Sequence, residues 1–147
     1  MTLPDVNGWL IDYRTAHAIF SSGSNQKILH IVDLCLAGTL FCCFCEKQFF
    51  NEFSPLKAVF ISDQNRVIVP DEKVLQRTLA LADSKVGKNR FKGNESAIFL
   101  AATAIENSYG VISDHKSITF STVHDIGEKY GIPVFSSQGY FGALGMI

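Results

Sequence analysis

The chain has 147 residues, of which 47% are hydrophobic and 18% charged, and its formal net charge is -1. This length fits a single domain over residues 1–147 with a sizeable core. The balanced charge excludes a polybasic nucleic-acid binder, and the apolar fraction excludes a disordered tail. The longest apolar run, residues 34–45, is interrupted by Gly38 and Thr39, so no membrane span is expected. The first residues lack the pattern of a signal peptide.

The first half of the chain alternates short apolar runs with helical patterns. Residues 9–11 and 40–45 predict buried strands, because each is a short, unbroken apolar run. Apolar residues recur at helical spacing over 28–36, and Gly38 ends that helix. An amphipathic pattern over 46–53 predicts a second helix, which Pro55 stops. Further strand signals lie at 58–61 and 66–69.

The second half continues the alternation. A helix over 71–82 begins at its cap Asp71, and we expect Val74, Leu75, Leu79 and Ala82 on one apolar face. The elements expected after it are a basic loop at 85–92, a helix at 95–107, a strand at 111–112, a helix at 121–130, a strand at 132–135 and a short helix at 139–144. Strands that alternate with helices predict an α/β fold, a three-layer α/β/α sandwich with a mainly parallel central sheet.

All four cysteines lie close together in the sequence, at Cys35, Cys42, Cys43 and Cys45. A disulfide framework would spread them along the chain, and a zinc site would need a second, distant ligand pair. We therefore expect reduced cysteines that act as small apolar residues, which indicates a reducing, cytoplasmic environment.

Four acidic residues stand where a parallel sheet places functional groups. Asp12 and Asp114 follow short apolar strands, Glu95 lies in the first turn of a helix, and Glu52 lies near the end of another. Ligands bind at the carboxyl ends of parallel strands. Carboxylates that converge there repel one another unless a hard divalent cation joins them. Each acid also has a purely structural interpretation, as a helix cap, a first-turn acid, a turn residue or a solvated charge.

The C-terminal third of the chain resembles the PIN-domain (PilT N-terminus) nucleases. In these proteins a glycine and a glutamate open an alanine-rich helix, a strand then ends in an acid, and a Gly-Ile-Pro-Val segment follows a further helix. The matching residues here are Gly93, Glu95, Asp114 and the segment 131–134. The N-terminal half is similar more weakly: WLID places Asp12 at the family's first acid, and EKQFFNEF places Glu52 at a later glutamate.

This resemblance implies a metal-dependent endoribonuclease that hydrolyses single-stranded RNA, and many such domains are the toxins of toxin–antitoxin pairs. Carried over to this sequence, Asp12, Glu95 and Asp114 would bind Mg²⁺ or Mn²⁺. Glu52 would bind the ion directly or hold a coordinated water, which completes the expected catalytic set. The implied partners are RNA, a cognate antitoxin protein and a second copy in a homodimer. The phenylalanine-rich segment 41–53 would serve as a dimer surface or, equally, as core.

Cations near the acids are the expected RNA contacts. Arg14 adjoins Asp12, while the loop before Glu95 carries further basic residues, among them Lys88, Arg90 and Lys92. The alternatives are a solvated loop and an ion pair between Arg14 and one of the acids.

Two further functions stay open. Tyr13 and Arg14 follow Asp12 where the family has small residues, and His115 follows Asp114 where many members have a second acid. These departures favour a catalytically degenerate PIN-like domain that binds protein or RNA. An unrelated flavodoxin-like nucleotide domain is the third class, although no glycine-rich phosphate loop follows the first strand.

Overall fold

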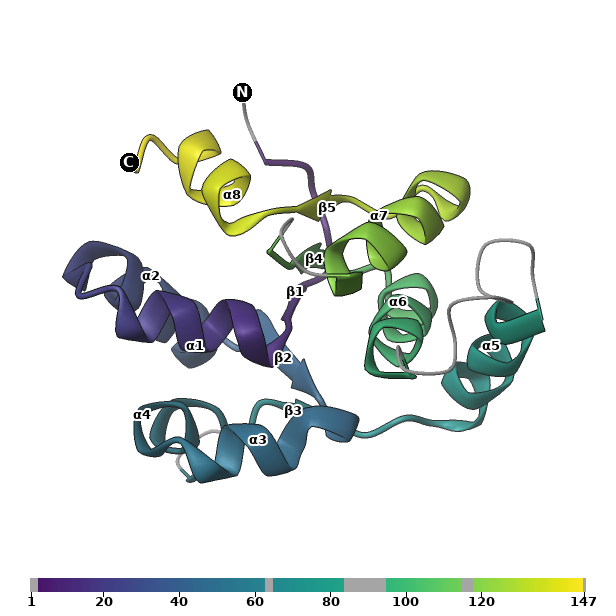
Figure 1. Ribbon diagram of the computed structural model, residues 1–147, viewed down its shortest axis with the longest axis horizontal. Helices are drawn as coiled ribbons and strands as arrows, with labels where there is room; N and C mark the ends of the chain where they lie inside the picture. The colour runs from purple at the N-terminus through teal and green to yellow at the C-terminus, as the bar shows by residue number, and fades with distance from the viewer. Residues whose placement is uncertain (1–2, 63–64, 84–94, 115–117, 147) are drawn as a thin grey trace.

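A computed structural model describes residues 3–62, 65–83, 95–114 and 118–146 of the chain (Figure 1). Its centre is a sheet of five parallel strands in the order β3-β2-β1-β4-β5. The strands are β1 (Trp9–Ile11), β2 (Leu40–Cys43), β3 (Val67–Ile68), β4 (Gly110–Ile112) and β5 (Val134–Phe135). The predicted α/β class and parallel sheet are confirmed.

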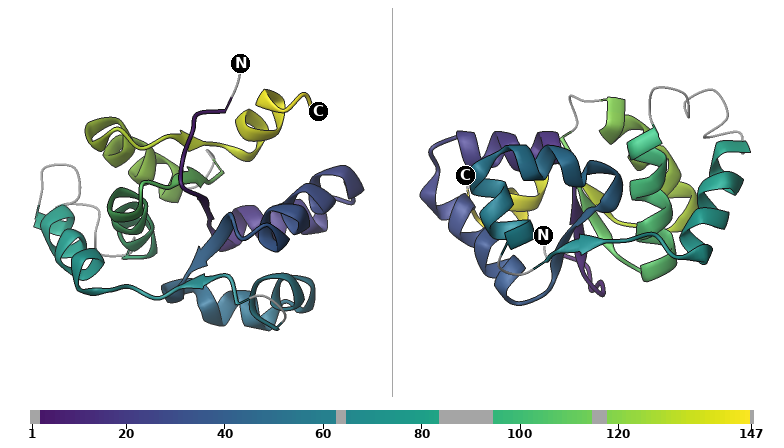
Figure 2. Two further views of the ribbon diagram at one scale, coloured as in Figure 1. Left: turned by 180° about the vertical axis from the view of Figure 1, so that it is seen from behind. Right: turned by 90° about the horizontal axis from the view of Figure 1, so that it is seen from below.

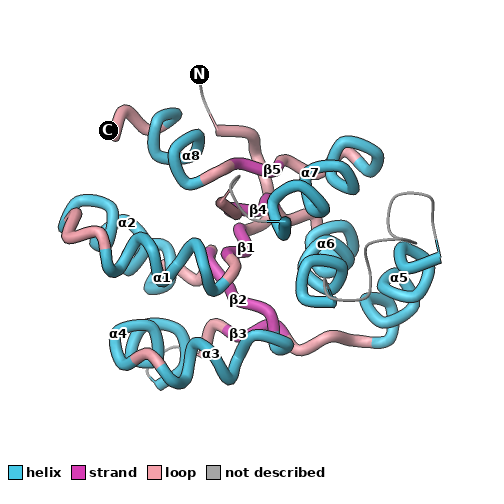
Figure 3. Tube along the Cα trace, in the orientation of Figure 1, coloured by secondary structure: helices cyan, strands magenta, loops and turns pink. Residues whose placement is uncertain are grey.

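Helices cover both faces of this sheet, which makes a three-layer sandwich (Figures 1 and 2). One face is covered by α1 (Tyr13–Ser21), α2 (Asn25–Leu36), α3 (Lys47–Glu52), α4 (Ser54–Lys57) and α8 (Ser137–Ala143). The other is covered by α5 (Glu72–Asp83), α6 (Glu95–Asn107) and α7 (Ile118–Tyr130). A 3-10 turn, η1 (Phe44–Glu46), joins β2 to α3, and a π-helical turn, η2 (Ala58–Ser62), follows α4. Figure 3 shows the strands running through the middle of the molecule.

The central strand β1 serves both layers because successive side chains point to opposite faces. Trp9 and Ile11 belong to the core under α1–α4 and α8, whereas Leu10 belongs to the core under α5–α7. All three β1 residues are buried. A strand that is buried on both sides reads in the sequence as an unbroken apolar run, which explains why this short element could be predicted.

Two local elements differ from the sequence prediction. Helix α1 was not predicted at all. Residues 58–61 form the turn η2 rather than a strand. The helix predicted over 46–53 does end ahead of Pro55, because α3 stops at Glu52. Pro55 then stands in the first turn of α4, where a missing backbone N–H removes no helical hydrogen bond.

Helix α5 confirms the predicted span and cap but not the predicted face. The backbone N–H of Val74 donates to Asp71 Oδ1 over 2.9 Å. Leu75 and Leu79 are 46% and 68% exposed, whereas Thr78 is buried with its hydroxyl donating to the carbonyl of Val74. A polar residue can therefore occupy the buried face of this helix, because its hydroxyl is satisfied within the helix. Among the described residues, no helix is long and apolar enough to cross a membrane.

Candidate carboxylate site

Asp12 lies directly after β1 and caps the first turn of α1. Its Oδ1 accepts from the backbone N–H of Thr15 over 2.9 Å, and its Oδ2 accepts from the Ser113 hydroxyl over 2.6 Å. The side chain is only 2% exposed. Burial raises the pKa of Asp12 above its ordinary value, and the nearby charge of Asp114 raises it further. The hydrogen bonds from Ser113 and Thr15 lower the pKa and offset part of this increase. Asp12 is thus both a helix cap and a buried acid at the carboxyl edge of the sheet.

Glu46 stands at the matching position after the neighbouring strand β2. It ends the turn η1, and its Oε1 accepts from the backbone N–H of Tyr13 over 3.2 Å. Burial raises the pKa of Glu46 to about 8, the negative charge of Asp12 contributes, and Arg14 acts in the opposite direction. Because the charge of Asp12 raises the pKa of Glu46, the two carboxyls lie within electrostatic reach, so Glu46 and Asp12 belong to one site.

Asp114 joins this site from the other neighbour of β1, the strand β4. Its backbone N–H donates to Thr15 Oγ1 over 2.8 Å, and the carboxyl is half-buried. The buried Thr15 therefore bonds to Asp12 through its N–H and to Asp114 through its hydroxyl. We call Asp12, Glu46 and Asp114 the carboxylate site. It draws one acid from the end of each of three adjacent strands, as the topology of a parallel sheet allows.

The other two predicted acids lie in different surroundings. Glu95 is exposed at the first residue of α6, a helix that contacts η1. Glu52 is exposed at the last residue of α3 and accepts from Gln48 Nε2 on its own helix over 3.4 Å. The described interactions place Glu46, rather than Glu52, beside Asp12. The roles predicted for Glu52 and Glu95 remain predictions.

The predicted cationic residues are only partly described. Arg14 is exposed on α1 and acts electrostatically on Glu46. Lys88, Arg90 and Lys92 lie outside the described residues. Tyr13 packs its ring against Phe49 and Phe50 of α3, with centroid distances of 5.5 and 5.7 Å. The bulk of Tyr13 is therefore accommodated by α3.

The donor set of the carboxylate site consists of hard oxygens. Burial disfavours the charged forms of Asp12 and Glu46, and a divalent cation would remove that penalty. Within the described ranges, no three His, Cys, Asp or Glu side chains are grouped closely enough to hold a metal ion as they stand. The chemistry of the donors fits Mg²⁺ or Mn²⁺, but a complete ligand cage would require the carboxyls to move closer together.

Glu46 is the site residue that the sequence prediction missed. Its signal was present: it is the first acid after a buried apolar strand, the same pattern that singled out Asp12 and Asp114. The predicted strand extended to residue 45, and Glu46 was then assigned to the polar face of the following helix. Strand β2 ends at Cys43 instead, and the turn η1 directs the Glu46 carboxyl toward α1.

No protein-family model, curated protein or solved structure matches this chain. The geometry of the carboxylate site and the sequence pattern are therefore the basis on which a function can be assigned.

Proposed function

We propose that this chain is a divalent-metal-dependent endoribonuclease that hydrolyses single-stranded RNA at the carboxylate site. The observation that carries the proposal is the buried Asp12 beside the half-buried Glu46 and next to Asp114, at the carboxyl edge of the parallel sheet. Buried acids in mutual repulsion destabilise the folded state when they are charged, and a bound cation would offset this penalty. The likeness of residues 93–145 to PIN-domain nucleases supports the same assignment.

The chain's own residues have distinct tasks in this proposal. Asp12, Glu46 and Asp114 would hold Mg²⁺ or Mn²⁺, with Glu95 as a further candidate ligand. Ser113 and Thr15 fix the orientation of the Asp12 carboxyl through hydrogen bonds to its two oxygens. The cation would supply charge neutralisation at the scissile phosphate and a lowered pKa for the attacking water. Arg14, exposed beside the acids, would contact the RNA phosphates together with Lys88, Arg90 and Lys92.

The biological setting follows from the same resemblance. We propose a cytoplasmic protein that acts as a toxin and is neutralised by a separate antitoxin chain. Cys35, Cys42, Cys43 and Cys45 are free thiols, which supports a reducing compartment. A homodimer is part of this proposal and can be measured by light scattering.

A metal titration tests the site without requiring activity. The metal-free protein is melted at increasing Mn²⁺ concentration, beside the Asp114→Asn variant. An ion that binds only the folded state at about 100 times its dissociation constant adds about 2.7 kcal/mol to the free energy of unfolding. We expect this shift in the wild type and in Glu52→Gln, a control that removes an exposed acid outside the site. An equal shift in Asp114→Asn would contradict the proposal.

RNA cleavage tests the reaction itself. We expect Mn²⁺- or Mg²⁺-dependent cleavage of single-stranded RNA by the wild type and none by Asp12→Asn or Asp114→Asn, with circular dichroism confirming that both variants fold. A cleaving Asp12→Asn/Asp114→Asn double variant would overturn the assignment.

One observation favours a second function, that of a catalytically degenerate PIN-like domain which binds protein or RNA. The guanidinium of Arg14 already compensates part of the charge at Glu46, and no cation is then needed at that position. This alternative predicts no Mn²⁺ shift in the wild type, together with a gain of Mn²⁺ binding in Arg14→Ser. It also predicts RNA or protein binding that is indifferent to chelators.

A further inference from the structure

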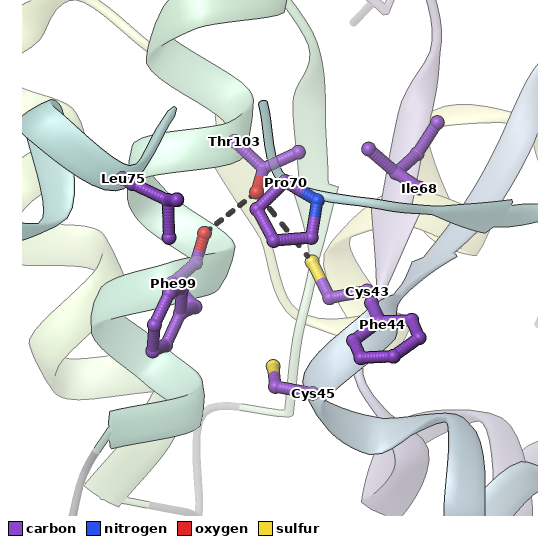
Figure 4. A pocket seen from close by; sticks show the side chains of 8 residues that line it. All are labelled: Cys43, Phe44, Cys45, Ile68, Pro70, Leu75, Phe99 and Thr103. Carbon is purple, nitrogen blue, oxygen red and sulfur yellow. Dashed lines mark hydrogen bonds between the residues drawn. The ribbon is translucent and has the colours of Figure 1, made fainter. Parts of the chain in front are cut away.

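A small cavity lies between the β2–β3 edge of the sheet and the helices α5 and α6. Its volume is about 130 Å³. Figure 4 shows the side chains around it, and apart from two thiols and one hydroxyl they are apolar. The cavity is lined by Cys43, Phe44, Cys45, Ile68, Pro70, Leu75, Phe99 and Thr103. We call it the thiol cavity.

The polar groups at the rear of the cavity are satisfied within the protein. The Thr103 hydroxyl donates to the carbonyl of Phe99 over 2.7 Å and accepts from the Cys43 thiol over 3.9 Å. Cys43 is only 3% exposed. A ligand in this cavity would therefore meet hydrocarbon walls and would find few free hydrogen-bonding groups, which favours an apolar occupant.

Cys45 is the thiol that reagents can reach. It is an exposed residue, whereas Cys35, Cys42 and Cys43 are buried. Burial raises the pKa of Cys35 to about 12 and that of Cys42 further. Cys45 is therefore the cysteine that a reagent from solvent meets first.

The size of the cavity sets the size of its ligand. An apolar protein cavity of about 150 Å³ holds a benzene molecule. A volume of about 130 Å³ is thus suited to one ring or a short hydrocarbon chain. Phe44 is 49% exposed and Leu75 is 46% exposed, so the cavity is accessible past these two residues.

We propose that the thiol cavity is a covalent binding site for short-chain α,β-unsaturated aldehydes or ketones, with Cys45 as the nucleophile and the cavity as the receptor for the hydrocarbon chain. The Cys45 sulfur forms a bond to the β-carbon as the carbon–carbon double bond opens. The electron pair moves to the enolate, which takes a proton from water at the α-carbon, while the thiol proton is released to solvent. The addition needs no oxidant, reductant or leaving group.

Two enals of different length test this site. The full chain is treated with trans-2-octenal or with acrolein, adduct formation is followed by intact mass, and peptide mapping locates the modified residue. Both rates are divided by those of glutathione, which has no cavity. We expect Cys45 to be modified first and the octenal-to-acrolein rate ratio to exceed that of glutathione by about tenfold, because several methylenes leave water. A ratio equal to that of glutathione would overturn the proposal.

Two tryptophan variants on α5 provide a matched pair. Leu75→Trp enlarges a side chain that lines the cavity, whereas Leu79→Trp enlarges one that is 68% exposed and does not line it. We expect Leu75→Trp to reduce the octenal-to-acrolein ratio toward that of glutathione and Leu79→Trp to leave it unchanged. Cys45→Ser should abolish the first adduct. Equal ratios in the two tryptophan variants would contradict a role for the cavity, and the wild-type ratio remains decisive if Leu75→Trp does not fold.

Discussion

The two faces of the sheet are filled by side chains of very different size. The core under α1–α4 and α8 contains large buried rings, namely Trp9, Phe50, Phe60, Tyr140 and Phe141. The core under α5–α7 has no fully buried ring among the described residues, and helix α6 presents to it Ala97, Ala101, Ala102 and Ala104. Small side chains let a helix lie close to the strands, and α6 contacts β1, β2 and β4. We therefore expect the face under α1–α4 and α8 to lose stability when a large side chain is truncated. The face under α5–α7 should lose stability when a small side chain is enlarged.

The largest expected effect is a cavity on the aromatic face. Phe60 is fully buried, and its ring packs against Phe50 at a centroid distance of 4.9 Å. Phe60→Ala should lower the free energy of unfolding by about 3–5 kcal/mol, measured by urea denaturation. If the loss were under about 1 kcal/mol, the aromatic face would be less tightly packed than we describe.

The opposite face should respond to enlargement. Ala102 is fully buried on α6. Ala102→Leu should lower the free energy of unfolding by about 1–3 kcal/mol through overpacking. Ala80→Leu is the matched control, because Ala80 is exposed on the adjacent helix α5 and should tolerate the same change. An Ala102→Leu variant with an unchanged free energy of unfolding would indicate that the core on this face can accommodate a larger side chain.

Glu46 lies where the two faces of the sheet meet, since η1 contacts both α3 and α6. We expect the Glu46 carboxyl to make the free energy of unfolding depend on pH. The folded protein keeps the Glu46 proton up to about pH 8, whereas the unfolded chain releases it near 4.5. Between these values the folded state binds more protons, so the free energy of unfolding falls as pH rises. The stabilising contribution is complete below about pH 4.5 and is lost on passing pH 8. The slope approaches about 1.4 kcal/mol per pH unit.

Denaturation of the metal-free protein at several pH values measures this slope. Glu46→Gln should reduce it, and the remaining part should have the same sign, because burial also raises the pKa of Asp12. Identical slopes in the wild type and Glu46→Gln would show that this carboxyl is hydrated rather than buried.

The smallest expected effect concerns the cap of α5 on the alanine-rich side. Asp71 is exposed and accepts from the backbone N–H of Val74. Asp71→Ala should cost about 1 kcal/mol in thermal denaturation, whereas Asp71→Asn should cost less because the amide oxygen still accepts. A loss equal to that of Phe60→Ala would mean that Asp71 does more than cap a helix.

The elements that the sequence predicted share a strong local signal. The strands β1, β2 and β4 are unbroken apolar runs, and α2, α5 and α6 have clear helical spacing. Helix α1 was missed although a helix cap was one of the interpretations open for Asp12, because no helix was assigned to the residues that follow it. Residues 58–61 have strand-like composition, but they continue directly from α4 as a helical turn. Their conformation depends on tertiary packing, which the composition of four residues does not predict.

The sequence also predicted part of the carboxylate site, namely the acids that directly follow predicted strands. Asp12 and Asp114 were found because a parallel sheet gathers its strand ends on one edge. Glu46 obeys the same rule and was lost through an error of two residues in the end of β2. The hydrogen bond between Ser113 and Asp12 joins residues that are 101 positions apart in the sequence. No local sequence pattern predicts a contact between residues so far apart. Glu52 was chosen by resemblance instead of by its place in the sheet.

The sheet order also bears on how the protein folds. The central strand β1 pairs with β2 through Trp9 and Leu40 and with β4 through Ile11 and Ile112. During synthesis, the edge of β1 that will face β4 stays without its partner until about a hundred further residues have been made. An unpaired apolar strand edge is a template for association with other chains, and distant pairings form slowly. The pairing of β1 with β4 also brings Asp12 and Asp114 together, so the nascent protein has no complete carboxylate site until this late pairing has formed.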